Sequence, residues 1–441
     1  MTEVQEIRYE AQRISEENRE PEWMRRLRLR AVELYARLPE PRWLPNWEGL
    51  DVQSMILYRG SGRAVSSWED LPPEVRRIYE RLNLPELEKK YLAGLSATMD
   101  SSTVYASVSE KLRALGVILE PMNDAVRTHG DIVRRYFSRI FPAAEHKYSA
   151  LHYALWSGGV FLYVPPNVQV DMPVEAFFYI STALEGQFEH TLIVADRNSS
   201  VHFIEGCAAP IFRDFTFHDG AVEIYAHEGA RVRFTTIQNW SKSVVNFNNK
   251  RVIAERGATV DWVEGSIGSK YSVVYPSVVL KGEGASTSMQ VFSISKGSYI
   301  KDGGAKIFHL APNTRSTIVS KSISAEGGVN IYRGLVRINR GARNAVSSVS
   351  CDSLLLDDRS NAATIPHAQI DEPTAVFSHE AATFRLSPEV LFYLQSRGLD
   401  EDAARGLAVL GFISDIIREL PLEYASVLRE VVSADFSGGV G

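Results

Sequence analysis

The middle of the chain consists of short segments in which apolar and polar residues alternate, separated by small turn clusters. Alternation with a period of two residues is typical of β-strands that bury one face. The pattern begins near residue 150, in strings such as FLYVPPNVQV, HTLIVAD and VHFIEG, and helical patterning is then absent as far as residue 385. We therefore predict a mainly β core over residues 146–385.

The turn clusters recur at a nearly constant spacing of 27 to 31 residues. They centre on Asn198, Gly229, Gly257, Gly284, Asn313, Gly341 and Glu372. A fixed period of this size is typical of a solenoid, in which each coil buries its apolar face against the next coil. We predict a right-handed β-helix-like solenoid of roughly seven coils. A large antiparallel sandwich with evenly spaced hairpins is the alternative.

Helical periodicity flanks this core on both sides. In the N-terminal region, 1–145, apolar residues recur every three or four positions in EPEWMRRLRLRAVELYARL, and prolines end that helix. Further helices are expected over 72–96 and 124–140, with a packed loop over 41–70. In the C-terminal region, 386–441, Ser387-Pro388-Glu389 and Asp400 are typical helix starts, and a third helix is expected through EYASVLREVV.

Composition narrows the class of protein. The 441 residues include 48 Lys and Arg against 54 Asp and Glu, a net charge of -6, so nucleic acid is a poor partner. Two cysteines form no disulfide framework and indicate a reducing compartment. The polar N-terminus has no secretory signal, and no apolar run reaches the roughly 18 residues of a membrane span. We expect a soluble, cytoplasmic protein that binds no membrane.

Several common catalytic motifs do not occur. The chain has no G-x-x-x-x-G-K-[ST] phosphate loop, no H-E-x-x-H and no G-x-S-x-G. Any energy-driven step would therefore need a partner that hydrolyses ATP. The chain also has no C-x-x-C, so a zinc ribbon or a four-cysteine cluster site does not fit one chain.

Cys207 and Cys351 are the two sulfur nucleophiles. In HFIEGC, strand alternation places Glu205 and Cys207 on one face and His202 on the other. A nearby carboxylate raises the pKa of a thiol, so these residues alone favour the alternative that Cys207 is a small buried apolar residue. Cys351, in SVSCDS before the run LLL, has the same alternative.

His379-Glu380 combines two residue types that bind iron or zinc. Strand neighbours face opposite sides, so only a local bend would let both reach one ion; the alternative is a rim histidine with satisfied hydrogen bonds. Gln238 and Trp240 share one strand face and need hydrogen-bond partners there. Lys250 follows ten residues later and is either functional or simply solvated.

The repeat relates some of these residues to one another. Counted from their turn centres, Cys207 and Gln238 lie nine residues on, and Cys351 lies ten. Equal offsets place side chains above one another in a solenoid, so we expect these three along one column. Burying a column of polar and sulfur-bearing side chains costs folding free energy unless these groups have hydrogen-bond partners or serve a function.

Several strings, taken together, resemble the SufB/SufD family, the scaffold subunits of the SUF system for iron–sulfur cluster assembly. They are EGCAAP (205–210), TTIQNW (235–240), YRGLVRI (332–338), CDSLLL (351–356), SHEAAT (378–383) and LFYLQSRGLDEDAA (391–404). The likeness covers nearly the whole chain. It favours SufB, because SufD usually has Gly after its His; a SufD-like structural partner without sulfur chemistry is the alternative.

The resemblance implies a scaffold rather than an enzyme. A cysteine desulfurase or a sulfur carrier would deliver persulfide sulfur to Cys207, from which it would pass to Cys351. Gln238, Trp240 and Lys250 match polar positions that line the SufB interior and would shelter the passage.

The resemblance also implies a transient Fe–S cluster held by Cys351, His379 and Glu380, with ligands from a second subunit completing the site. That subunit would be SufD or a second copy of this chain. Tyr179 and Ser181 stand where SufB proteins often carry Arg and Asn, and SNAATIP (360–366) lacks the Cys and His of the usual CGAHTFP. In these departures the chain resembles family members that pair with a second copy of themselves.

The resemblance also implies one further partner and one cofactor. The C-terminal helices resemble the docking surface for SufC, an ABC-type ATPase. The family also suggests FAD as a cofactor. A rival of another class is a carbohydrate-active β-helix lyase. It would need secretion and paired acids on one coil face, and neither is evident.

Overall fold

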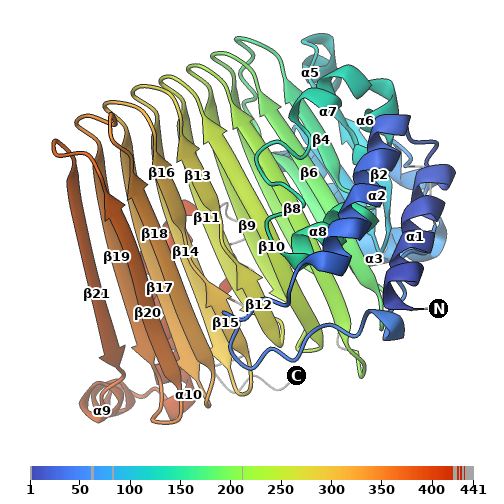
Figure 1. Cartoon of the computed structure of the whole chain (residues 1–441). Helices are drawn as coiled ribbons and strands as arrows, with labels where there is room; N and C mark the ends of the chain where they lie inside the picture. The colour runs from blue at the N-terminus through green and yellow to red at the C-terminus, as the bar shows by residue number, and fades with distance from the viewer. Residues whose placement is uncertain are drawn as a thin grey trace.

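The computed structural model describes residues 2–60, 64–81, 84–210 and 212–420, together with 425, 426, 428, 429 and 432. Its main body is a β-solenoid of about eight turns, with helices at both ends (Figure 1). Two large sheets face each other, and successive coils pair in parallel. The predicted solenoid is therefore confirmed, and the antiparallel sandwich is wrong.

The first sheet has ten strands. In spatial order they are β2 (Ser102–Val108), β1 (Gly94–Met99), β5 (Val174–Tyr179), β7 (Ser200–Ala208), β9 (Arg231–Trp240), β11 (Thr259–Gly268), β14 (Ser286–Lys296), β17 (Arg315–Ala325), β19 (Val346–Leu355) and β21 (Val376–Arg385).

The second sheet lies opposite, and several of its coils contribute two short strands instead of one long strand. Its members are β3 (Ile118–Pro121), β4 (Val160–Val164), β6 (Gly186–Ala195), β8 (Thr216–Ala226), β10 (Val244–Ala254), β12 (Tyr271–Val274), β13 (Ser277–Leu280), β15 (Ile300–Gly303), β16 (Lys306–His309), β18 (Val329–Ile338) and β20 (Asn361–Ile370), the last paired with β18.

The predicted turn centres stack along one edge of the solenoid. The five from Asn198 to Asn313 have positive φ, between 57° and 71°, a conformation that Gly and Asn adopt with least strain. The N–H of Gly229 donates to the carbonyl of Arg256 in the next turn, and the others repeat this bond. A further turn centres on Asn167, whose side chain accepts from Asn198 at 3.2 Å. The solenoid thus has one coil more than the turn pattern predicted.

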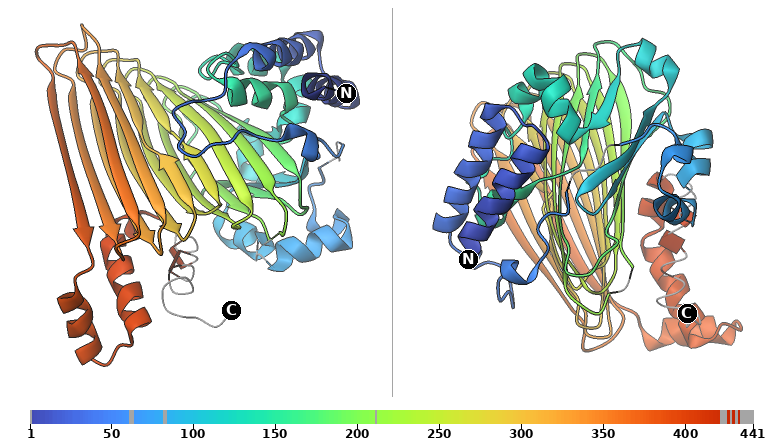
Figure 2. Two further views of the ribbon diagram at one scale, coloured as in Figure 1. Left: turned by 60° about the horizontal axis from the view of Figure 1, so that its bottom comes forward. Right: turned by 90° about the vertical axis from the view of Figure 1, so that its right-hand side faces the viewer.

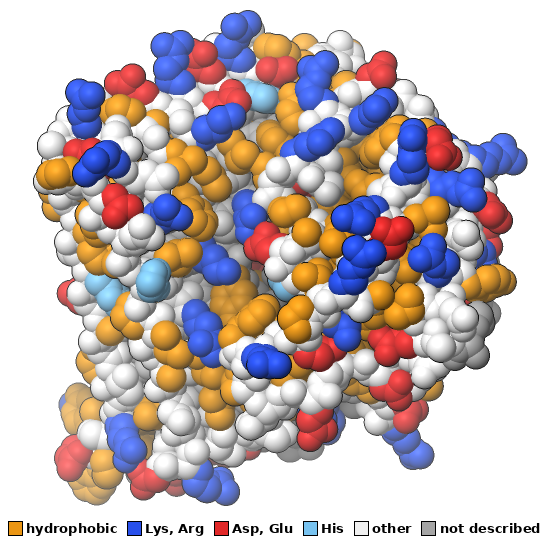
Figure 3. Space-filling view, in the orientation of Figure 1, with side chains coloured by type: hydrophobic (Ala, Val, Ile, Leu, Met, Phe, Trp, Pro, Cys, Tyr) orange, Lys and Arg blue, Asp and Glu red, His pale blue; other side chains and the backbone are white. Residues whose placement is uncertain are grey.

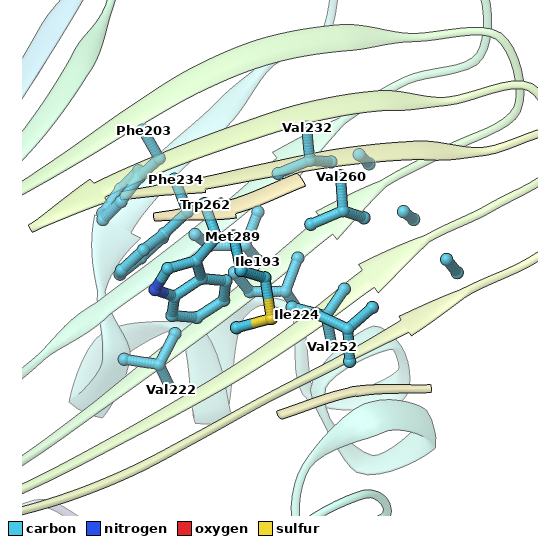
Figure 4. Close-up of a cluster of buried hydrophobic side chains, with 14 of the residues drawn as sticks. Ile193, Phe203, Val222, Ile224, Val232, Phe234, Val252, Val260, Trp262 and Met289 are labelled. Atoms are coloured by element: carbon cyan, nitrogen blue, oxygen red, sulfur yellow. The ribbon is translucent and has the colours of Figure 1, made fainter. Parts of the chain in front are cut away.

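The interior is divided lengthwise into two strips. The apolar strip contains the register-matched column Phe203, Phe234, Trp262 and Met289 of the first sheet, which faces aliphatic residues of the second sheet (Figure 4). The rings of Phe234 and Trp262 lie 4.5 Å apart between centroids. Burying these side chains supplies about 1.5–3 kcal/mol each, so this strip holds the coils together. The polar strip carries the candidate site and is described below.

The N-terminal region closes one end of the solenoid. Helices α1 (Glu3–Glu17), α2 (Glu22–Arg37) and α8 (Lys147–Leu155) pack on the outer face of the second sheet. Figure 2 shows these helices and the C-terminal helices on opposite sides of the solenoid. Helices α6 (Met122–Thr128) and α7 (Gly130–Tyr136) replace the single helix expected over 124–140. The short helices η1 (Val52–Ser54) and η2 (Trp68–Asp70) interrupt the expected loop.

This region is not purely helical, as we had expected. Besides α3 (Pro73–Arg81), α4 (Leu84–Tyr91) and α5 (Glu110–Ala114), it supplies strands β1, β2 and β3. β2 pairs with β1, and β3 with β4, in antiparallel fashion, and Val65 hydrogen-bonds the outer edge of β2. These pairings end the parallel stacking. The strands were missed because their residues are almost continuously apolar or small, without a clear period.

At the other end, helices α9 (Pro388–Ser396), α10 (Glu401–Phe412) and α11 (Ser414–Glu419) follow the last strand. The predicted starts are confirmed, because the Ser387 hydroxyl accepts from the N–H of Val390 and the Asp400 carboxylate from that of Ala403. Helices α10 and α11 pack on the outer face of the first sheet. The third predicted helix falls mostly outside the described residues.

The outer face of the second sheet is polar toward the C-terminal coils. Figure 3 shows Lys and Arg side chains around a hollow on this face. A cavity of about 300 Å³ is lined there by Trp43, Tyr275, Lys306 and Arg333, among others. None of the helices in the described part of the chain has the length and apolar character needed to cross a membrane.

Candidate functional site

The polar strip runs through the interior beside the apolar strip. On the first sheet it comprises two inward-facing columns, matched rung by rung. One column contains Glu205, Thr236, Glu264, Val291, Ser320 and Cys351. The other contains Cys207, Gln238, Ser266, Ser293, Ser322 and Ser353. The second sheet faces them with the column Gln187, His218, Asn246, Ser272, Lys301 and Asn330.

Cys207 and Gln238 therefore share a column, as their equal offsets predicted. The prediction that Cys351 continues that column is wrong, because it lies in the adjoining one, two residues back along the strand. The cause is a longer turn, in which both Gly341 and Asn344 have positive φ. Asn344 bonds Asn313 of the previous turn and is the true centre, seven residues before Cys351.

Cys207 is buried, with 3% of its surface exposed, on the same strand face as Glu205. Burial raises the pKa of its thiol well above the usual range. The carboxylates of Glu205 and Glu189 raise this pKa further, whereas the Lys250 ammonium lowers it. In the closed solenoid Cys207 is thus a neutral thiol. His202 points to the other face and meets Thr235.

Lys250 is not solvated. Its ammonium lies in the interior, 2.8 Å from the Glu205 carboxylate and 3.2 Å from that of Glu264. Burial opposes the charged ammonium, but the two carboxylates outweigh it and raise the pKa of Lys250 above its usual value. Burial also raises the pKa of Glu264 to about 7, although Lys250 lowers it. One lysine thus balances two buried acids beside the Cys207 thiol.

Gln238 and Trp240 belong to a hydrogen-bonded layer next to this triad. The Gln238 carbonyl accepts from the amides of Asn246 and Asn248. His218 meets Asn246 at 2.8 Å, Glu189 at 2.7 Å, and the Trp240 ring at 4.4 Å between centroids. Among the described residues, the Gln238 amide nitrogen and the Trp240 indole nitrogen are buried without a hydrogen-bond acceptor. Two donors therefore point into the interior unpaired.

Cys351 lies near the far end of the polar strip, with 2% of its surface exposed. Burial raises the pKa of its thiol to about 12; the Tyr332 hydroxyl, against the thiol, lowers it and the Asp352 carboxylate raises it. Tyr332 comes from β18 and packs over Gly334, where a side chain would collide with its ring. This second thiol is therefore also neutral in the closed solenoid.

His379 and Glu380 lie on the terminal strand β21. His379 pairs with Val349 and faces the interior, whereas Glu380 pairs with Ser350 and is exposed on the outer face. The register is unbroken from Val376 to Arg385, so the local bend that would bring both to one ion is absent from this strand. Cys351 and His379 face the same interior from adjacent strands, with Cα atoms roughly 8 Å apart by strand geometry.

His379 faces a terminal cavity of about 200 Å³, together with Tyr332, Val349 and Phe377. Its Nε2 atom is buried without a hydrogen-bond partner in the described part of the chain. Across the same described residues, no three His, Cys, Asp or Glu side chains converge to hold a metal ion. The geometry thus assembles two potential ligands at an incomplete site.

Sequence reasoning missed much of the polar strip. Glu205 and Glu264 both lie seven residues after their turn centres, so their common offset could have identified a column of acids. Lys301 and Tyr332 had no such signal, since they lie on the second sheet, where strand breaks disturb the spacing.

The fold and the site together define a class of protein: a β-solenoid whose polar interior contains one buried thiol in its second coil and another near its open C-terminal end. Two family models match the chain, "SUF system FeS cluster assembly, SufBD core domain" over residues 178–412 and "SufBD protein N-terminal region" over 78–176. The chain belongs to the SufBD family of iron–sulfur cluster assembly proteins.

Individual relatives agree with the family models. An "Iron-sulfur cluster assembly SufBD family protein" from Staphylococcus epidermidis is 42% identical over 429 residues, which is 97% of this chain and 92% of the relative. Similarly named proteins from Staphylococcus aureus and Staphylococcus saprophyticus are 42% and 41% identical over the same length. These matches do not distinguish SufB from SufD.

Proposed function

We propose that this chain is a SufB-type scaffold subunit on which Fe–S clusters are built from persulfide sulfur and iron. The observation that carries the proposal is the polar strip, which contains both cysteines and ends beside an inward-facing histidine with an unpaired ring nitrogen. A purely structural SufD-like subunit, the alternative, has no need of two thiols in one costly polar interior.

In this proposal Cys207 accepts persulfide sulfur from a cysteine desulfurase or a sulfur carrier. Gln238, Trp240 and Lys250 shelter the route to Cys351, and the unpaired amide and indole donors of Gln238 and Trp240 favour an anionic sulfur species. Thiolates, not thiols, are nucleophiles, and burial raises the pKa of both thiols. The chemistry therefore requires the solenoid to open, which supports an energy-driven partner.

The cluster is cargo that forms at the open end of the solenoid. Cys351 and His379 supply ligands from this chain. Glu380 lies on the outer face, so it can act as a ligand only where a second subunit docks or after the strand rearranges. The terminal strands β20 and β21 expose Ile365, Val376 and Phe384, with 45%, 61% and 49% of their surfaces accessible. Apolar side chains on a free edge favour docking of SufD or of a second copy.

The ATPase partner is assigned to the C-terminal helices. Helix α9 buries none of its residues and exposes Val390, Phe392 and Tyr393, with Phe392 72% accessible. Such a patch is typical of a protein-binding surface. A SufC-type ABC ATPase docked there would act on the adjoining last coil. Flavin binding and a cytoplasmic location stay predictions from the family resemblance and the composition.

Anaerobic reconstitution with iron and sulfide, followed by visible absorption, tests the cluster site. Wild-type protein should gain an Fe–S chromophore, and Cys351→Ser should lose most of it. Cys207→Ser is the matched control, because free sulfide bypasses sulfur acceptance at that position. An equal chromophore in Cys351→Ser, or none in wild type, would leave the SufD-like alternative.

Partner binding is tested by pull-down with a purified SufC-type ATPase and by sedimentation. Phe392→Asp should abolish capture of the ATPase, whereas Tyr9→Asp, which changes an exposed residue on α1, should not. Val376→Lys should shift a dimer toward monomer. If Phe392→Asp still captured the ATPase, the ATPase would not dock on α9.

A further inference from the structure

The two thiols are too far apart to exchange sulfur directly. Along the first sheet, Cys207 on β7 and Cys351 on β19 are separated by β9, β11, β14 and β17. At about 4.8 Å per strand, these steps amount to roughly 24 Å. A thiolate must approach a persulfide to about 3–3.5 Å to attack it. Sulfur that crosses the closed interior must therefore leave one cysteine before it meets the other.

A small inner cavity lies between the two thiols. Its volume is about 40 Å³, and residues of the polar strip from both sheets contribute to its lining. Glu264, which bonds Lys250 near Cys207, lies at one end, and Tyr332, against the Cys351 thiol, lies at the other. This volume suits a few waters or one hydrosulfide ion, and it excludes metabolites and peptides.

Lys301 of β15 lines this cavity and is buried. Its ammonium donates to the carbonyl of Gly268 and to the hydroxyls of Ser269, at 2.7 Å, and Ser272, at 3.2 Å. Carbonyl and hydroxyl oxygens satisfy its N–H bonds but leave its positive charge uncompensated. Burial lowers the pKa of Lys301 to about 7, so a neighbouring anion would hold the proton on this amine.

The two acids that line the cavity do not neutralise Lys301. The Glu264 carboxylate is held by Lys250 at 3.2 Å and by the Trp262 indole N–H at 3.1 Å. The Asp302 carboxylate is held by Arg333, with contacts at 2.9 and 3.1 Å, on the outer side of the sheet. Lys250 pairs with two carboxylates, whereas no carboxylate of the described residues pairs with Lys301, although both lysines are buried.

We propose that the cavity beside Lys301 binds hydrosulfide in transit from Cys207 to Cys351. The ammonium supplies the countercharge. The hydroxyls of Ser266, Ser272, Ser293 and Ser322 line the cavity and can rotate to donate to the anion. This inference rests on the proposed function, and it defines the sulfur species that the interior carries.

The chemistry balances with a dithiol reductant. One thiolate of the dithiol attacks the inner sulfur of the Cys207 persulfide, the S–S bond breaks and hydrosulfide leaves. The second thiol then displaces the Cys207 thiolate, which takes a proton, while the dithiol closes to a disulfide. The sulfane sulfur gains two electrons and the dithiol loses two. At the cluster site the hydrosulfide loses its proton and becomes a bridging sulfide without further redox change.

Anion binding is tested on crystals of the full chain soaked in bromide, a monovalent anion with an anomalous signal. Wild type should show a bromide in the cavity beside Lys301. Lys301→Gln keeps a hydrogen-bond donor and removes the charge, and its bromide occupancy should fall at least tenfold. Lys306→Met, which changes an outer-face lysine, should leave the peak unchanged. Bromide found only at the surface of wild type, or equally in Lys301→Gln, overturns the proposal.

Sulfur transit is tested by labelling Cys207 with radioactive persulfide sulfur, adding dithiothreitol without air, and counting the label after rapid gel filtration. Wild type should retain the released sulfide, and Lys301→Gln should retain at least tenfold less. Loss of all label from wild type overturns the inference alone. Failure of Cys207 to accept label overturns the proposed function instead, so the two failures are distinguishable.

Discussion

Replacing Lys250 by Met should destabilise the solenoid strongly, and by an amount that depends on pH. The Lys250 ammonium lies 2.8 Å from Glu205 and 3.2 Å from Glu264, and all three groups are buried. Removing one partner of a buried ion pair costs about 3–5 kcal/mol, because the remaining charge is left uncompensated. Here two carboxylates lose the one cation that pairs with them among the described residues, so we expect a loss at the upper end of that range at pH 8.

The pH dependence follows from the carboxyl that takes up a proton in the variant. The pKa of Glu264 is about 7 even beside Lys250, and it rises further when that charge is removed. Below this folded pKa the native variant binds a proton that the unfolded chain releases above about pH 4.3. Stability of the variant should therefore fall by about 1.4 kcal/mol per pH unit from pH 5.5 up to its raised folded pKa, whereas the same fall in wild type ends near pH 7. The loss of stability caused by the substitution should therefore grow above pH 7.

Urea unfolding at pH 5.5, 7 and 8, followed by the fluorescence of the buried Trp240 and Trp262, measures this loss. Lys250→Met combined with Glu264→Gln should recover part of the stability at pH 8, since only one uncompensated carboxylate remains. Lys306→Met is the control for loss of a lysine. A Lys250→Met protein as stable as wild type at pH 8, or a loss independent of pH, would refute the reasoning.

Three further predictions concern Lys301, Cys351 and Gly268. Lys301→Met should be more stable than wild type at pH 7 and lose this advantage by about pH 10. The reason is that Lys301 stays protonated up to its usual pKa in the unfolded wild-type chain, whereas its pKa in the folded protein is about 7. If the free energies of unfolding of the two proteins changed in parallel with pH, the prediction would be contradicted. At pH 8 Cys351 should react with iodoacetamide about three orders of magnitude more slowly than a free cysteine, because a pKa of about 12 leaves little thiolate. Mass spectrometry of labelled peptides over time measures the rate. Labelling as fast as that of a free cysteine would contradict the prediction. Gly268→Ala should lower the free energy of unfolding by more than about 3 kcal/mol, since its new Cβ would lie 1.7 Å from the Trp240 carbonyl oxygen. Gly257→Ala is the control: it has a similar φ but open space around the new Cβ, and should lower that free energy by about 1–2 kcal/mol. Equal losses in urea unfolding would contradict the prediction and show that the close approach is relieved.

The repeat made the solenoid predictable from sequence. A turn that needs a positive φ restricts its residue type, so Asn and Gly mark each coil in the letters of the chain. The offset from these marks then identified Cys207 and Gln238 as stacked neighbours, which the structure confirms. The same reasoning failed for Cys351, because two residues with positive φ in one turn left its centre ambiguous.

Partners across the interior could not be predicted in this way. Lys250 meets Glu205 and Glu264 only because the second sheet faces the first, and no spacing within one strand encodes that distance. Lys301 lies on a strand of four residues, too short for its alternation to stand out. Strands β1 and β3 likewise belong to the solenoid through pairing with the later strands β5 and β4 rather than through the repeat.

The two ends of the solenoid differ, and this asymmetry limits how the protein can associate. Parallel strand stacking can in principle continue without end, as it does in fibres. Here antiparallel pairing of β1 with β2 and of β3 with β4 ends the parallel stack, and Val65 bonds the outer edge of β2. At the opposite end β20 and β21 are the last parallel strands of the described residues. If β20 and β21 form the proposed contact, each molecule has one such edge, and we expect association through it to stop at a pair. The antiparallel strands at the N-terminal end thus oppose further parallel stacking there, while the edge formed by β20 and β21 stays available for assembly.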